Sequence, residues 1–275
     1  MFNPFKKVKQ AWRILREHKT MPLRLEFVLG DQCNLNCRGC THYSPLAEGD
    51  QRPFDEFKRV VERVARAVAD DIPTVYLMGG ETLMYPRLVE AIGLMRENFP
   101  KSSLSLFTNG ILLPKMGEEF WKACRDNHCR IAITRYPVKF DYDGAERLVR
   151  KNGVECRVFG NREGDDGFFR FALDPAKKQN AATSHFKCYN FGCVSVVGDR
   201  IYPCSLSGCV EHLNKKFGTD FRHTPADYIE VGSLYNVNQI RALRDKPVPF
   251  CAYCKLPPAT TRWAPSKREK TEWVD

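Results

Sequence analysis

Short apolar runs alternate along the first 160 residues with longer segments in which apolar residues recur at helical spacing. The apolar runs predict buried strands at "RLEFVLG" (24–30), "TVYLM" (74–78), "LSLF" (104–107), "RIAIT" (130–134) and "VECRVF" (154–159). The segments between them predict helices over 53–69, 83–98, 114–127 and 143–153. Strands and helices that alternate at this rhythm favour an α/β fold, in which a parallel sheet forms a barrel or part of one.

The pattern changes after residue 160. The polar, glycine-rich stretch "GNREGDDG" (160–167) is typical of a linker or an active-site loop. The run "VSVVGDRIYPC" (194–204) predicts a hairpin that turns at Gly198 and Asp199. A short helix is expected over 237–244, followed by "FCAYC" (250–254) and a charged tail. We therefore expect a small, cysteine-rich α+β region after the main sheet.

Composition and charge narrow the function only a little. The chain has 275 residues, of which 43% are hydrophobic, and it contains no apolar run as long as the ~18–20 residues of a membrane span. Its first residues lack the apolar stretch of a signal peptide, so we expect a cytoplasmic protein with no membrane partner. The net charge of +10 is spread along the chain, with modest concentrations near 6–24 and 262–270, and does not by itself indicate a nucleic-acid partner.

Twelve cysteines change the picture. Cytoplasmic thiols stay reduced, so cysteines at short spacings there favour metal ligation over disulfides. In "CNLNCRGC", Cys33, Cys37 and Cys40 offer three thiolates, one fewer than the four donors of a closed site. An iron–sulfur cube held by three cysteines keeps one iron open for chemistry. A zinc knuckle would need a fourth ligand, for which His42 is the local candidate.

Three motifs together resemble those of the radical S-adenosylmethionine (SAM) superfamily. They are CxxxCxxC after the first predicted strand, "GGE" in "LMGGETL" (77–83) after the second, and "TNG" in "LFTNG" (106–110) after the third. The carboxyl ends of strands are where β/α barrels gather their active sites. The resemblance implies a partial (β/α)6, TIM-like barrel that binds SAM at an open iron of a [4Fe–4S] cluster. The implied SAM-binding residues are Gly79, Gly80, Glu81, Thr108 and Asn109.

The resemblance also implies a reaction, in which reduction of the cluster cleaves SAM to a 5′-deoxyadenosyl radical that removes hydrogen from a substrate carbon. A flavodoxin- or ferredoxin-type protein would donate the electron. One position departs from the family pattern: Gly39 stands where a bulky residue usually precedes the third cysteine, so we expect adenine packing from elsewhere, with Tyr43 as a candidate.

A second set of cysteines resembles the auxiliary-cluster "twitch" domain, a short form of the SPASM domain. Cys188, Cys204, Cys251 and Cys254 would enclose a second [4Fe–4S] cluster, although four cysteines also suit zinc. Cys193 and Cys209 are interleaved with them, which leaves the ligand choice at the hairpin open and makes both candidate hydrogen-atom donors.

For several single residues, the sequence gives only weak evidence of a role. Cys124, Cys129 and Cys156 fall on helix or strand patterns and are expected to be buried, inert thiols. Arg135 follows the fourth predicted strand and is a candidate contact for a substrate phosphate or carboxylate, or else a solvated rim residue. His42 and Glu48 are candidates for lining the cavity.

These expectations combine into one organisation. It comprises an N-terminal helical extension (1–21), a radical SAM core (22–160), a linker or last barrel segment (161–185), a twitch domain (186–256) and a tail (257–275). The first functional hypothesis is dehydrogenation of a carbohydrate-like substrate, meaning a sugar, aminocyclitol or nucleotide-sugar, with the auxiliary cluster accepting an electron. The alternatives are an epimerase that uses Cys193 or Cys209, a peptide-modifying SPASM-type enzyme, and a non-catalytic, zinc-stabilised nucleic-acid-binding protein.

Overall fold

The fold is built on one large sheet in which the predicted strands run side by side. A computed structural model describes residues 20–49, 51–160 and 167–275. Eight strands pair in the order β5-β4-β3-β2-β1-β7-β8-β9. Their bounds are β1 (Arg24–Val28), β2 (Thr74–Met78), β3 (Ser103–Thr108), β4 (Cys129–Thr134), β5 (Cys156–Phe159), β7 (Val194–Val197), β8 (Arg200–Tyr202) and β9 (Ile229–Glu230). Strands β1 to β5 and β7 are parallel, and β8 and β9 are antiparallel, which confirms an α/β fold with a parallel central sheet.

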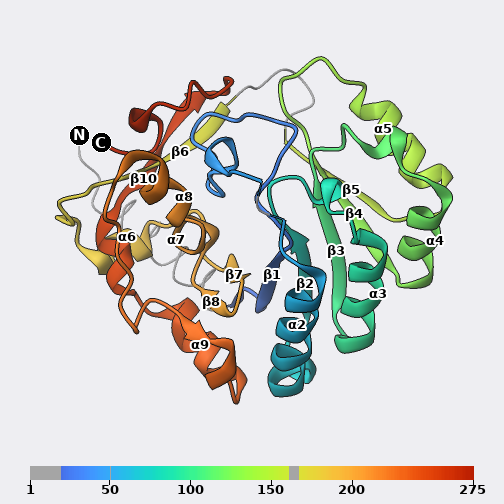
Figure 1. Cartoon of the computed structure of the whole chain (residues 1–275), viewed down its shortest axis with the longest axis horizontal. Coiled ribbons are helices and arrows are strands. Elements are labelled where there is room, and N and C mark those ends of the chain that lie inside the picture. The colour runs from blue at the N-terminus through green and yellow to red at the C-terminus, as the bar shows by residue number, and fades with distance from the viewer. Residues whose placement is uncertain (1–19, 50, 161–166) are drawn as a thin grey trace, which may run out of the picture.

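Helices cover the outer face of this curved sheet. They are α2 (Phe54–Val68), α3 (Leu88–Asn98), α4 (Glu118–Asp126) and α5 (Tyr142–Lys151), and Figure 1 shows them beside β2 to β5. Helix α2 buries Phe57, Val61, Val64 and Val68 along one stripe. Phe57 meets Phe27 of β1 with the rings 6.4 Å apart. Each crossover helix thus forms because its apolar stripe matches the buried face of the strands.

The hairpin is where the expected barrel differs from the observed sheet. Strands β7 and β8 form at the predicted place, with Gly198 in the turn at φ 60°. However, β7 pairs in parallel with β1 and extends the main sheet from the edge opposite β5. The cysteine-rich region therefore has no separate sheet at this point, and the sixth parallel strand neighbours the first.

The remaining chain closes over the open side of the sheet. Strand β6 (Gly167–Leu173) pairs antiparallel with β10 (Cys254–Arg262), so part of the expected linker and the start of the expected tail are strands. The small helices are α6 (Ala181–Phe186), α7 (Ser205–Gly208), α8 (Glu211–Phe217) and α9 (Val237–Asp245). Residues 1–19 of the expected N-terminal helical extension lie outside the described residues. Within the described part of the chain, no helix has both the length and the apolar character to cross a membrane.

Candidate active site

The carboxyl ends of β1, β2 and β3 surround a cavity of about 350 Å³. Cys33, Cys37 and Cys40 all line it, from the loop that follows β1, which we call the Cys33–Cys40 loop. Gly79, Gly80, Thr108 and Asn109 line it as well, whereas Glu81 does not. The volume falls within the range typical of small-molecule sites, ~300–1,000 Å³. Three motifs far apart in the sequence thus meet at one edge of the sheet.

The two residues after β2 must be glycines because the backbone of residues 30–32 passes directly against them. A Cβ at Gly79 or Gly80 would lie closer than 3.0 Å to carbonyl oxygens of residues 30–32. Instead, Gly80 N–H donates to the Gly30 carbonyl at 2.9 Å, and Glu81 N–H donates to that of Gln32 at 2.7 Å. These bonds tie the strand end of β2 directly to the segment that enters the Cys33–Cys40 loop.

Glu81 acts behind the cavity wall. It is 3% exposed, and its carboxylate accepts hydrogen bonds from Thr108 Oγ1 at 2.5 Å, Asn109 N at 2.8 Å and Leu83 N at 3.0 Å. Burial raises the pKa of Glu81, against the lowering effect of these bonds. The carboxylate therefore fixes the "TNG" turn, and Asn109 in turn donates to Asn34 Oδ1 at 2.6 Å in the Cys33–Cys40 loop.

A second cavity brings the other predicted cysteines together. Cys188, Cys204, Cys251 and Cys254 all line it, among apolar neighbours such as Phe191, Val248 and Phe250. Its cysteines come from three segments: the loop after α6, the end of the hairpin, and the 3-10 turn Pro249–Tyr253 that leads into β10. Phe171 and Asn190 line both this cavity and the first one, so the two sites share a wall.

The comparisons with known proteins point to one family. Residues 27–152 match the Radical SAM superfamily. This part of the chain is a radical SAM domain. Among curated proteins, a GTP 3′,8-cyclase of Helicobacter pylori (strain HPAG1) is 32% identical over 119 residues, which cover 43% of this chain and 35% of the relative. A GTP 3′,8-cyclase of Alkaliphilus oremlandii (strain OhILAs) is 29% identical over 149 residues, covering 54% and 43% respectively. The chain spans less than half the length of these curated relatives.

The structure of BtrN in complex with AdoMet and 2-DOIA shares the fold. It aligns with a TM-score of 0.53 at 14% identity, over 86% of this chain and 94% of BtrN. At that identity the likeness supports the architecture alone and leaves the reaction to be argued from the site.

The residues of the first cavity fit the SAM and [4Fe–4S] cluster that radical SAM membership implies. Cysteines of such a cluster bind different irons, so their sulfurs spread around a cavity. A zinc ion instead needs its donors within ~2.0–2.3 Å of one point. Among the residues that the structure describes, no three Cys, His, Asp or Glu side chains converge in that way.

Protonation of the loop thiols depends on their surroundings. Burial raises the pKa of Cys33 and of Cys37 to about 12. Burial also acts to raise the pKa of Cys40, but the His42 imidazole together with backbone hydrogen bonds from Ser44 and His42 outweighs it, so the pKa is lowered. Since metals bind thiolates, cluster assembly here releases protons. His42 also lines the first cavity, as expected, whereas Glu48 pairs with Lys215 at 3.3 Å and does not line it.

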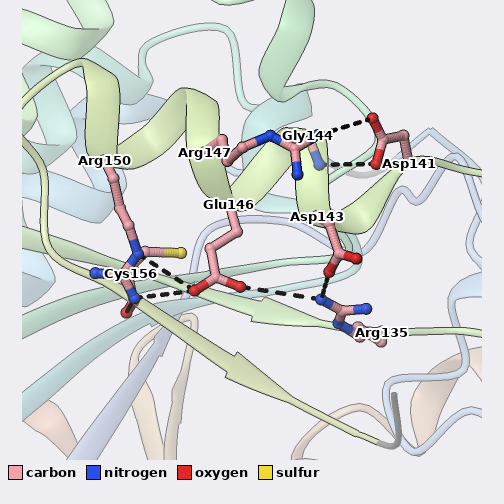
Figure 2. Close-up of polar contacts among 8 residues, drawn as sticks. All are labelled: Arg135, Asp141, Asp143, Gly144, Glu146, Arg147, Arg150 and Cys156. Carbon is pink, nitrogen blue, oxygen red and sulfur yellow. Dashed lines mark hydrogen bonds and ion pairs between the residues drawn. The ribbon is translucent and has the colours of Figure 1, made fainter. Parts of the chain in front are cut away.

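Arg135 lies away from the cavity, which corrects its expected role as a substrate contact. Thr134 and Tyr136 line the cavity, and extended residues alternate sides, so Arg135 points the other way. Figure 2 shows it reaching Asp143 and Glu146 of α5, the latter at 3.9 Å. The anion partners that the sequence suggested for Arg135 are therefore supplied by the protein itself.

Tyr43 is also placed differently from expectation. It is fully buried, does not line the cavity, and donates its hydroxyl to the Leu206 carbonyl at 3.2 Å. The aromatic residues of the cavity are instead Phe107, Tyr136, Phe168, Phe169 and Phe171. Gly39 has a local explanation, since its φ of 70° lies in the left-handed region that disfavours a side chain.

The interleaved thiols lie outside both cavities. Cys193 accepts a hydrogen bond from Arg24 at 3.0 Å, and Cys209 donates to Asp31 at 3.8 Å. Neither lines the first or the second cavity, so the hydrogen-donor role suggested by the sequence does not match their positions. Cys124, Cys129 and Cys156 are buried, as expected of inert thiols.

The residues that sequence reasoning missed come from the end of the sequence. Trp263 Nε1 donates to Cys37 Sγ at 3.2 Å, and Trp273 Nε1 donates to the Cys40 carbonyl at 2.9 Å. The β-branched pair Thr260–Thr261 is a strand signal in the segment read as a tail. The spacing gave no sign that this segment reaches the first loop.

Proposed function

We propose that this protein is a radical SAM oxidoreductase that dehydrogenates a carbohydrate-like substrate, with an auxiliary [4Fe–4S] cluster at Cys188, Cys204, Cys251 and Cys254. The observation that carries the proposal is the shared wall of Phe171 and Asn190 between the two cysteine-lined cavities. A site with four thiolates and no open position suits electron acceptance rather than substrate binding. Its place beside the active site is where an electron from the substrate would be collected.

The chain's own residues position the reactants and exclude water. Cys33, Cys37 and Cys40 would hold the first cluster, and the backbone at Gly79, Gly80 and Asn109 would border SAM. Bound there, SAM and its cluster would supply the radical that removes a hydrogen atom from a substrate carbon. Phe107, Tyr136, Phe168 and Phe169 line the cavity with rings that keep water from the reaction. Loss of a hydrogen atom, a proton and an electron amounts to loss of two hydrogens from the substrate.

The lining of the cavity favours a substrate without phosphates. Of the described residues that line it, none is Lys or Arg. Phosphate recognition normally uses these side chains because they supply charge-assisted hydrogen bonds. A nucleoside triphosphate, the substrate named for the GTP 3′,8-cyclase relatives, therefore fits this lining poorly. A sugar or aminocyclitol presents hydroxyl groups and apolar ring faces, which suit Asn109, Asn190 and the aromatic rings.

The alternatives receive less support. An epimerase that returns hydrogen from Cys193 or Cys209 would need one of these thiols at the first cavity, and neither lines it. No observed feature favours a peptide substrate. A zinc-stabilised nucleic-acid-binding protein would need sulfurs that converge on one point, which the described residues do not provide.

Anaerobic reconstitution tests the proposal. We expect two four-iron clusters, or about eight irons per chain, and SAM cleavage under a low-potential reductant. Cys204→Ser should lose about half of the iron, whereas the matched Cys193→Ser should keep all of it. Stoichiometric zinc without iron would contradict the proposal. In deuterated water, a product lighter by two hydrogens supports dehydrogenation, and a product of unchanged composition that carries deuterium on carbon supports epimerisation.

The proposed enzyme needs a reducing compartment and an electron donor. The reduced thiols that the clusters require are maintained in the cytoplasm. We place the enzyme there, with a flavodoxin- or ferredoxin-type protein as its electron donor and no membrane or nucleic-acid partner.

A further inference from the structure

The segment that follows β10 lies directly on the Cys33–Cys40 loop. We call residues 263–275 the C-terminal segment. Arg38 N–H donates to the Ala264 carbonyl at 2.9 Å, and Ser266 N–H donates to the Asn36 carbonyl at 2.7 Å. Asn36 Nδ2 adds a bond to the Ser266 carbonyl at 2.8 Å, and Cys37 faces Pro265 in an antiparallel bridge. The middle of the loop is therefore paired with the other end of the sequence as if the two were adjacent strands.

Two tryptophans of this segment contact the loop in different ways. Trp263, which is half-buried, donates its indole N–H to the sulfur of Cys37 at 3.2 Å. Trp273, which is fully buried, donates to the backbone carbonyl of Cys40 at 2.9 Å. One indole thus touches a ligating atom, while the other touches only the backbone that carries a ligand.

We propose that Trp263 is a positioning residue that raises the reduction potential of the cluster at Cys33, Cys37 and Cys40 through its hydrogen bond to Cys37 Sγ. The C-terminal segment as a whole holds the loop in its ligating conformation. This inference rests on the cluster that radical SAM membership implies, and it does not depend on the auxiliary cluster or on the substrate.

The direction follows from electrostatics. One-electron reduction adds negative charge to the cluster and its thiolates, and the positive end of an N–H dipole at a sulfur stabilises that charge. Hydrogen bonds to the sulfurs and exposure to solvent are the established controls of such potentials. The indole of Trp263 supplies such a hydrogen bond directly. A more negative potential is harder for a protein donor to reach, so the bond makes the first electron transfer easier.

The test compares Trp263→Phe with Trp273→Phe in the full chain carrying its clusters. Both changes remove one indole N–H and keep an aromatic ring. We expect Trp263→Phe to lower the midpoint potential of the SAM-binding cluster, followed by electron paramagnetic resonance during a titration with dithionite. Trp273→Phe should leave that potential unchanged and lower only the thermal midpoint. Equal potentials in wild type and Trp263→Phe would overturn the proposal, as would an equal shift in both variants.

A second measurement covers a variant that folds but does not load the cluster. In the cluster-free protein, alkylation of each cysteine is followed by mass spectrometry. We expect Cys37 to react several-fold more slowly in Trp263→Phe than in wild type, because the N–H dipole that stabilises negative charge on its sulfur is gone, with Cys33 unchanged. Equal rates at Cys37 would overturn the proposal. A wild-type protein that binds no iron at all would instead count against the proposed function, which separates the two failures.

Discussion

The two cysteine sites differ in how the chain assembles them. The first takes its three sulfurs from eight consecutive residues, and it opens into a cavity lined by Thr108, Asn109 and His42. The second takes four sulfurs from segments up to 66 residues apart, and it lies among apolar side chains. The single Cys33–Cys40 loop therefore leaves one side of its cavity open for a ligand. The separate segments of the second site instead surround their cavity.

The difference also appears in what supports each site. The Cys33–Cys40 loop has no apolar core of its own and is held by hydrogen bonds from the ends of β2 and β3 and from the C-terminal segment. The second site is part of the packed core, with Phe250 and Leu206 each about 2% exposed. We therefore expect changes at the first site to act mainly on chemistry, and changes at the second to act on electron acceptance and folding together.

The largest effect is expected from the cysteines themselves. Cys33→Ala should abolish SAM cleavage because it removes a ligand of the cluster with the open iron. Cys204→Ala should keep reductive SAM cleavage but abolish dehydrogenated product, since the electron acceptor that we propose would be lost. Both outcomes are read by chromatography of 5′-deoxyadenosine and product. Cys209→Ala, a buried thiol outside both cavities, is the matched control. If Cys204→Ala lost SAM cleavage as Cys33→Ala does, the result would contradict the proposal that only the first site cleaves SAM.

The next effect concerns the backbone contact that supports the first site. Gly80→Ala should lower the free energy of unfolding by about 1–3 kcal/mol, because its Cβ would overlap backbone that cannot move aside. Gly93→Ala in α3 is the control, since nothing lies within 4 Å of its Cβ. There, alanine should stabilise the helix by about 1 kcal/mol. Chemical denaturation measures both; similar changes in the two variants would show that the contact is not needed.

A smaller effect is expected from the buried carboxylate. Glu81→Gln should cost about 1–2 kcal/mol, because one of the donors around it would face an amide N–H₂ group. Burial raises the pKa of Glu81 in the folded state above its ordinary 4.5. The folded protein therefore binds this proton more tightly, and its contribution is present at low pH and lost as pH rises through the raised value. The stability gap between wild type and Glu81→Gln should narrow over that window. A gap that widens with pH would show that the pKa is lowered instead.

The smallest effect is expected at Arg135. Arg135→Gln removes its pairs with Asp143 and Glu146. Because the Arg135 side chain is only 10% exposed while Asp143 is 67% exposed, we expect a loss of about 1 kcal/mol, the upper end for surface pairs. The KM for substrate should not change, because the side chain does not line the cavity. Arg147→Gln, which loses a pair with Asp141 at 3.7 Å, is the surface control. A rise in KM of about tenfold at Arg135 alone would restore it as a substrate contact.

Much of the fold could be predicted because buried strands and helix faces require apolar residues at regular spacings, which the sequence shows directly. Strands β1 to β5 and helices α2 to α5 form at the expected places, since an apolar run between amphipathic segments has few alternatives. The placement of β7 beside β1 could not be predicted, because a short apolar hairpin strand pairs equally well with either sheet edge by pattern alone.

The site could be predicted where residues are local or chemically distinctive. The three loop cysteines meet the "GGE" and "TNG" strand ends as expected, and Cys188, Cys204, Cys251 and Cys254 line one cavity, while their role as cluster ligands stays a prediction. Arg135 and Tyr43 were misplaced because a strand end does not reveal which way a side chain turns. Trp263 was missed because a single indole far along the chain carries no spacing pattern.

The pairing of the Cys33–Cys40 loop with the C-terminal segment has a consequence for biosynthesis. While the ribosome is still translating the middle of the chain, the first three cysteines have emerged but Trp263 and Trp273 have not. Contacts between residues this far apart in sequence form late. In a nascent chain, the Cys33–Cys40 loop would therefore lack its contacts with the C-terminal segment until translation passes residue 273. A cluster inserted before that point would bind a loop that is not yet held in its final conformation.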